Sequence, residues 1–171
     1  MTDARTPRSL QVDRSRRGRV LIWVAAVAVA VAFGAWFVTH PAPLPVPDEP
    51  VTVQIPRGES EYVGLYDPAA DDDRTLHISD VSIDVEGEAT VSVLVCQNGT
   101  VSVTHEPQTF CTDLVEAEGA TLSPGDGLVL EILEDEEGQA TIDPVEISFR
   151  EGVQWGTHQV GPTVEATFLS R

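Results

Sequence analysis

Two cysteines and four histidines carry the most versatile chemistry in this chain of 171 residues. Cys96 and Cys111 lie 15 residues apart, and His105 precedes the second cysteine by six residues. A thiol beside an imidazole is the start of a nucleophilic site. In an oxidising compartment, however, two cysteines usually form a disulfide, and an oxidised thiol cannot attack a substrate. We therefore predict a Cys96–Cys111 disulfide and no thiol catalysis.

Carboxylates are the most abundant reactive groups, because the chain holds 28 aspartates and glutamates. One turn gathers the oxygen ligands that Ca²⁺ prefers, namely those of Asp67, Asp71, Asp72 and Asp73. This turn lacks the alternating acids, the central glycine and the final glutamate of an EF-hand loop. We interpret it as a solvated acidic turn and predict no metal site, with these four residues as the weak candidates.

The sequence lacks the motifs on which most catalytic sites are built. It contains no lysine and no HExxH, GxSxG, CxxC or glycine-rich phosphate loop. Paired carboxylates can act as acid and base, but among so many acids some pairs lie close by chance. We predict that the protein is not an enzyme and that it has no cofactor.

The segment 152–161 combines aromatic and polar side chains between glycines, and we predict that it is a loop. Aromatic and polar groups on loops are the usual material of binding sites. The candidate binding residues are Gln154, Trp155, His158 and Gln159, to which Tyr62 and Tyr66 could add. The alternative interpretation, which we favour, is that Trp155 fills one end of the hydrophobic core.

An uncharged apolar run extends from Val20 to Val38 and predicts a transmembrane helix. As a helix it spans about 28 Å, close to the hydrocarbon thickness of a bilayer. A soluble helix would present a polar face to water, and this run has none. Trp23 and Trp36 lie near its two ends, where indole rings favour the headgroup region.

Six arginines precede this run and indicate its direction in the membrane. Basic residues that flank a first helix stay on the cytoplasmic side. We predict a disordered cytoplasmic tail over 1–19, a signal anchor over 20–38 and an extracytoplasmic remainder in the cell membrane. A cleaved signal sequence is the alternative, but its apolar region is usually shorter, about 7–15 residues.

The remainder of the chain is strongly acidic. From residue 40 onward, 26 acidic residues stand against four arginines, a net charge of −22. Such a domain should repel nucleic acid, so we predict no nucleic-acid partner. The lysine-free composition, rich in alanine, valine, aspartate and glutamate, resembles that of proteins from high-GC bacteria. Five prolines between 41 and 50 favour an extended linker over 39–50, which would act as a stalk.

Alternating apolar residues after position 51 predict antiparallel strands. The clearest alternations cover 81–85, 91–95, 101–103, 145–149 and 164–168. Asn98-Gly99 predicts a tight hairpin between strands 89–96 and 100–105, and a change of parity near Ser79 predicts a β-bulge. We predict an all-β fold over 51–171, an antiparallel β-sandwich of immunoglobulin-like architecture, with a small barrel as the alternative. The chain lacks the tryptophan between two distant cysteines that marks the immunoglobulin family itself.

These observations together favour a non-catalytic interaction or accessory module of the bacterial cell envelope, bound to an envelope protein of unknown identity. A small-ligand or Ca²⁺-binding β domain is the alternative, and an envelope hydrolase is the third hypothesis.

Overall fold

The computed structural model describes residues 14–56, 58–68, 74–133 and 137–169. Its first element is the helix α1 (Arg14–Val38), and within it Arg19–Val38 is long and apolar enough to cross a membrane. The helix begins before the apolar run and includes residues 14–19 of the predicted tail. The first 13 residues of the predicted tail lie outside the described residues.

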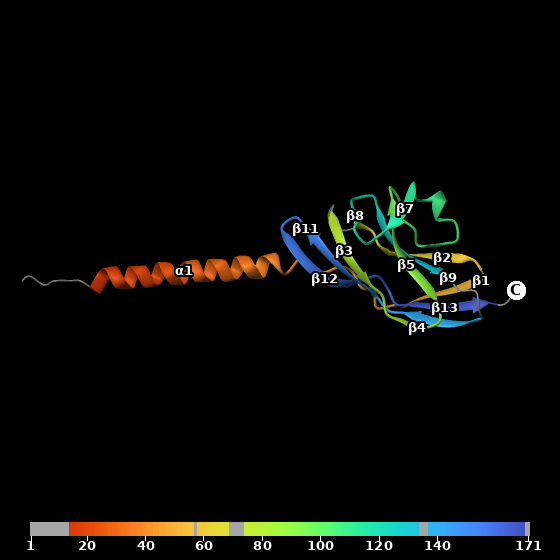
Figure 1. Ribbon diagram of the computed structural model, residues 1–171, viewed down its shortest axis with the longest axis horizontal. Coiled ribbons are helices and arrows are strands. Elements are labelled where there is room, and N and C mark those ends of the chain that lie inside the picture. The colour runs from red at the N-terminus through yellow and green to blue at the C-terminus, as the bar shows by residue number, and fades with distance from the viewer. Residues whose placement is uncertain (1–13, 57, 69–73, 134–136, 170–171) are drawn as a thin grey trace, which may run out of the picture. The chain divides into compact units, whose positions relative to one another are not determined.

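Short β-strands make up most of the chain after the helix, as the alternating sequence predicts (Figure 1). A short 3₁₀ helix, Pro107–Thr109, is inserted among them. The strands are β1 (Val51–Pro56), β2 (Ser60–Tyr66), β3 (Leu76–Ser82), β4 (Val85–Gly87), β5 (Thr90–Gln97), β6 (Val103–Thr104), β7 (Asp113–Glu116), β8 (Thr121–Leu122), β9 (Gly127–Leu133), β10 (Gly138–Ile142), β11 (Val145–Glu151), β12 (Gln154–Val160) and β13 (Val164–Leu169).

The described strands form three sheets, with the orders β1-β13-β10-β4, β12-β11-β3-β8 and β6-β2-β9-β5-β7. Every strand pairing in these sheets is antiparallel except that of β1 with β13, which is parallel. The prediction of a mainly antiparallel β fold is therefore confirmed.

All three sheets contribute to one hydrophobic core. Ile55 of the first sheet, Ile147 of the second and Leu130 of the third are fully buried in the same cluster. β9 is the most deeply buried strand, and its run of four buried residues from Gly127 to Leu130 explains why its sequence hardly alternates. Alternation in the neighbouring strands places one face of each in this core and the other in water.

Two local predictions had opposite outcomes. The predicted bulge is confirmed, because the register between β3 and β11 shifts opposite Ser79. The predicted hairpin at Asn98 is wrong: β5 pairs with β7 and β9, whereas β6 pairs with β2. Asn98 does have the positive φ of a tight turn, 52°. Its N–H, however, donates to the Asp126 carboxylate at 2.9 Å, and the next residue, Gly99, forms an isolated bridge with Asp126.

Candidate functional site

The proline-rich segment 39–50, which we call the strap, packs on the β domain. Leu44 is 6% exposed and belongs to the main core, and Pro41 is also buried. The segment was expected to extend away from the domain as a stalk. It does not, because burying these apolar side chains offsets the cost of fixing a chain that proline already stiffens.

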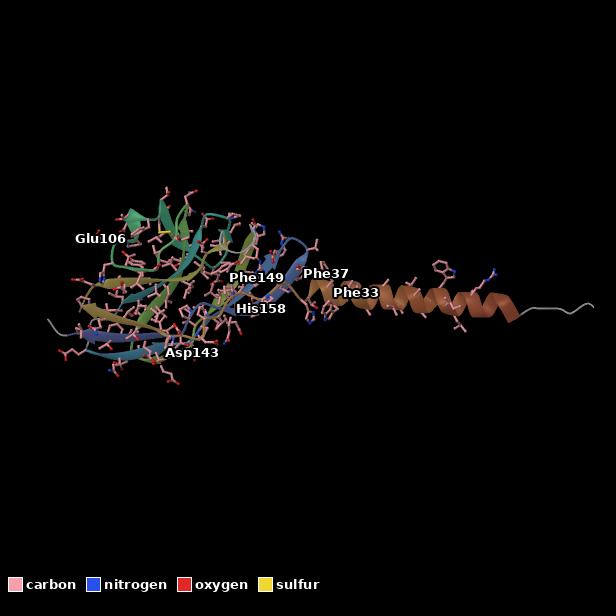
Figure 2. All side chains as sticks on the ribbon, turned by 180° about the vertical axis from the view of Figure 1, so that it is seen from behind. Phe33, Phe37, Glu106, Asp143, Phe149 and His158 are labelled. Carbon is pink, nitrogen blue, oxygen red and sulfur yellow. A yellow bond between two sulfur atoms is a disulfide. The ribbon has the colours of Figure 1, made fainter. Side chains whose placement is uncertain are left out.

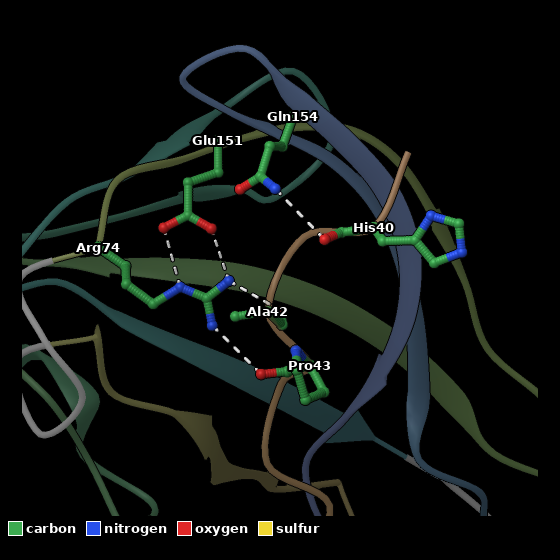
Figure 3. A network of polar contacts seen from close by, with 6 residues as sticks. All are labelled: His40, Ala42, Pro43, Arg74, Glu151 and Gln154. Atoms are coloured by element: carbon green, nitrogen blue, oxygen red, sulfur yellow. Dashed lines mark hydrogen bonds and ion pairs between the residues drawn. The ribbon is translucent and has the colours of Figure 1, made fainter. Parts of the chain in front are cut away.

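Arg74 fastens the strap to the end of β11 (Figure 3). Its Nε and Nη2 donate to the two carboxylate oxygens of Glu151 at 3.0 and 2.7 Å. The same guanidinium donates to the strap carbonyls of Ala42 at 3.0 Å and Pro43 at 3.3 Å. The hydrogen bonds with Glu151 raise the pKa of Arg74, against the burial that lowers it. A bidentate ion pair of this kind is both directional and strong.

The strap runs parallel to β12. The Gln154 side chain donates to the His40 carbonyl at 3.3 Å, and the Gly161 N–H donates to the Pro45 carbonyl at 3.1 Å. Between these bonds, a Cβ on Gly156 would lie 2.5 Å from the Pro41 ring, so glycine is needed for the close approach.

The segment 152–161, which was predicted to be a loop, is largely a strand. Residues 154–160 form the edge strand β12, joined to β11 by a turn at Gly152 and Val153. The interpretation of Trp155 as a core residue is wrong, because its side chain is 64% exposed. Trp155 lies on the outer face of the strand with Gln159, a parity that the neighbouring glycines obscured in the sequence.

The inner face of β12 holds the other two predicted residues. Gln154 binds the strap, as described, and the His158 ring lies against Phe149 with 5.8 Å between ring centroids (Figure 2). His158 is only partly exposed, so its role here includes packing. Four of the six candidate binding residues thus share one strand but face opposite ways.

Tyr62 and Tyr66 lie on β2, in a different sheet from β12. The Tyr62 hydroxyl donates to the Glu131 carboxylate at 2.7 Å. The pKa of Tyr62 is raised to about 12. The main cause is burial, and the second is the hydrogen bond to Glu131. Tyr66 is buried and contributes to the raised pKa of Arg74, so it belongs with the strap contacts. The tyrosines do not complete a binding patch around Trp155.

The thiols and His105 do not form a reactive pair. The Sγ atoms of Cys96 and Cys111 are 2.02 Å apart, at disulfide distance, as predicted. The Nδ1 atom of His105 lies 2.9 Å from the Glu61 carboxylate. Glu61 is 3% exposed, and this burial raises its pKa while the nearby His105 lowers it. Glu61 was not among the site residues predicted from the sequence, although its parity with Val63 places it on the inward side of the strand.

The acidic turn remains a prediction. Asp67 is the one member of its cluster that lies within the described residues, and 71–73 lie outside them. Among the residues that the structure describes, no three histidine, cysteine, aspartate or glutamate side chains are grouped to hold a metal ion.

A groove of about 560 Å³ opens between the end of the strap, β2 and the segment 100–103. Pro47, Gly64 and Val101 are among the residues that line it, and so is Tyr66. Of the six candidate binding residues, Tyr66 is the one that reaches this groove, so the groove and the outer face of β12 are separate features.

Comparison of the chain with protein-family models, with curated proteins and with solved structures finds no match.

Proposed function

We propose that this protein is a membrane-anchored, non-catalytic interaction module of a bacterial cell envelope, with its β domain outside the cytoplasm. The apolar segment Arg19–Val38 supports anchoring, and the arginines before it support a cytoplasmic N-terminus. The bridged cysteines favour an oxidising compartment. His105 lies beside the Glu61 carboxylate, and both cysteines are bridged, so the thiol–imidazole pair of a cysteine nucleophile is not formed.

The observation that carries the proposal is an apolar side chain held on an ordered loop. Phe110 is 53% exposed, and the next residue is bonded through its sulfur to β5. The backbone of the loop is also fixed, because the Phe110 N–H donates to the Pro107 carbonyl at 2.9 Å and the Thr112 N–H to the Gln97 carbonyl at 2.8 Å. An exposed aromatic residue that loses little entropy on binding is a typical interface anchor.

The charge of the domain defines the kind of partner. Its net charge of −22 attracts a protein with a basic surface and speeds their encounter. Val103, in the same disulfide-closed segment as Phe110, is 48% exposed and adds apolar area. We therefore propose an envelope protein with a basic rim around an apolar pocket.

We also propose that the three sheets pack as a β-sandwich of immunoglobulin-like architecture. The support is the main core cluster, to which residues of all three sheets contribute, beside a smaller cluster around the cysteine pair. An experimental structure in which the sheets enclose separate cores would contradict this arrangement.

Crosslinking in native membranes tests the function. The tagged full chain is crosslinked and recovered beside the variants Phe110→Ser and Leu169→Ser, the latter an apolar side chain of similar exposure on β13. We expect one reproducible protein partner with the wild type and with Leu169→Ser, and roughly tenfold less with Phe110→Ser, as for an interface anchor. Equal recovery with all three chains, or no reproducible partner, would contradict the proposal.

A further inference from the structure

The β11–β12 hairpin ends in two exposed apolar side chains on a domain that is otherwise strongly acidic. Val153, in the turn, is 67% exposed, and Trp155 follows it on the outer face of β12. The chain has no aspartate or glutamate from 152 to 164. The acid just before the turn, Glu151, is bound by Arg74 through two hydrogen bonds. Among the residues that the structure describes, the tip is therefore apolar, and the acid that precedes it is paired.

Trp155 is the first member of a cross-strand row that contains basic side chains and no carboxylate. Strand register places Arg150 beside Trp155, His77 beside Arg150, and Thr121 beside His77. All four side chains are exposed, and the His77 Nδ1 lies 2.9 Å from the Thr121 hydroxyl. Of the two domain arginines that the structure describes, Arg74 is bound to the strap and Arg150 is exposed in this row.

The same hairpin is held close to the residue at which the domain begins. Gln154, next to the turn, donates to the carbonyl of His40. His40 follows the last helical residue, Val38, by two positions. Because each residue extends a chain by at most about 3.6 Å, the His40 backbone lies within about 7 Å of the end of the apolar helix. The hairpin end is thus bonded to a residue that only a short length of chain separates from the apolar helix.

We propose that the hairpin end of the sheet β12-β11-β3-β8 docks on the phospholipid bilayer, with Trp155 and Val153 in the headgroup region and Arg150 on lipid phosphate. An indole ring favours that region, because its apolar body and its N–H both find partners there. A cationic side chain beside it suits the phosphates. The exposed acids of the same sheet face, Asp80 and Glu146, lie in rows further from the turn. Anionic lipid repels acidic side chains, so the row at the hairpin end is the part of this face that fits. The inference rests on the membrane anchoring of the proposed function.

Single-tryptophan variants of the full chain test this contact, because the protein has three tryptophans. The double variant W23F/W36F retains Trp155, and W23F/W155F retains Trp36 within the helix. Each is reconstituted into vesicles of phosphatidylcholine and phosphatidylglycerol, with or without lipid brominated near the top of the acyl chains. We expect roughly twofold lower emission from Trp155 in brominated vesicles, as for an indole at the headgroup level.

A matched control places the reporter elsewhere on the same face. Gln159→Trp, in a chain with the three native tryptophans replaced by phenylalanine, carries the ring four residues further from the turn. In a strand that separation is about 13 Å. We expect its emission to be nearly unaffected by brominated lipid, and Arg150→Gln to reduce the quenching of Trp155 in vesicles with phosphatidylglycerol.

Each result decides the inference. Quenching of Trp155 but not of the tryptophan at position 159 supports it. Quenching of Trp36 alone would overturn it while leaving the anchor intact, and would assign the row to a protein partner. Equal quenching at 155 and 159 would overturn the specific role of the hairpin end. No quenching of Trp36 would remove the anchor, and both proposals with it.

Discussion

Arg74 and Glu151 form a bidentate ion pair that joins the residues before β3 to the end of β11, with N–O distances of 3.0 and 2.7 Å. The pair does more than connect two strands, because the same guanidinium also binds two carbonyl oxygens of the strap. It thereby makes the proline-rich segment part of the β domain. The consequence is a domain that begins within a few residues of the helix.

Loss of the Arg74 guanidinium should release the strap. We expect Arg74→Gln to lower the free energy of unfolding by about 2 kcal/mol, because hydrogen bonds to charged groups contribute about that amount. The measurement is denaturant unfolding of the β domain in detergent-solubilised chain. Arg150→Gln, on the exposed face of β11, is the matched control and should change stability by less than about 0.5 kcal/mol. Equal effects of the two variants would mean that Arg74 does not hold the strap.

The strap should also respond to a single methyl group on β12. Gly156→Ala places a Cβ 2.5 Å from the Pro41 ring, and we expect a loss of about 1–3 kcal/mol, typical of overpacking. We expect limited proteolysis to cut within 39–50 in this variant and to leave the same segment of the wild-type chain intact. Gly138→Ala is the control, because its Cβ would meet nothing within 4 Å. An unchanged cleavage pattern in Gly156→Ala would argue against the close contact.

Glu61 should make stability depend on pH. Burial raises its pKa above the ordinary value of 4.5 in the folded state, so the folded chain holds this proton more tightly than the unfolded chain does. Stability from this group is present below pH 4.5 and falls as the pH rises through the raised pKa.

The variant Glu61→Gln isolates that contribution. We expect this variant not to show the decrease in stability that the wild type shows above pH 4.5. The variant should therefore become more stable relative to the wild type as the pH rises. Thermal melting across the acidic and neutral range measures this, with the exposed Glu118→Gln as control. Parallel pH profiles for Glu61→Gln and wild type would refute the role of burial.

Removal of the disulfide should destabilise the domain without unfolding the core. A loop closed over a separation of 15 residues contributes about 3 kcal/mol in the chain-entropy model. We expect the double variant Cys96→Ser/Cys111→Ser to lose about this amount in denaturant unfolding. A reducing agent should lower the free energy of unfolding of the wild type to that of the double variant. It should leave the free energy of unfolding of the double variant unchanged. An effect of the reductant on the variant would point to a cause other than this bridge.

Most strands were predictable, because each shows its period within a few residues. The alternation over 145–149 and 164–168 corresponds to β11 and β13, and the change of parity near Ser79 marks a real bulge. The disulfide was predictable for a simpler reason, since two cysteines allow one pairing. These features depend on the spacing of neighbouring residues or on the number of cysteines, and both can be read from a sequence.

The contacts around β12 were not predictable in the same way. Trp155 was favoured as a core residue and is exposed, because parity alone does not say which side of an edge strand is covered. Asn98 has the positive φ expected of a tight turn, yet its hydrogen-bond partner lies 28 residues later at Asp126 and not in a following hairpin strand. The strap was expected to be a stalk because proline predicts stiffness and says nothing of burial.

The sequence by itself determined an apolar helix with arginines before it, an acidic domain of alternating strands, and one cysteine pair. Helical and strand periods and net charge are properties of neighbouring residues, so they survive without a tertiary context. Only the tertiary structure decided that Arg74 meets Glu151, that the strap joins the core, and that Trp155 and Arg150 share an exposed row. Those relationships join residues far apart in the chain, and their energies depend on burial and register that only the assembled sheets create.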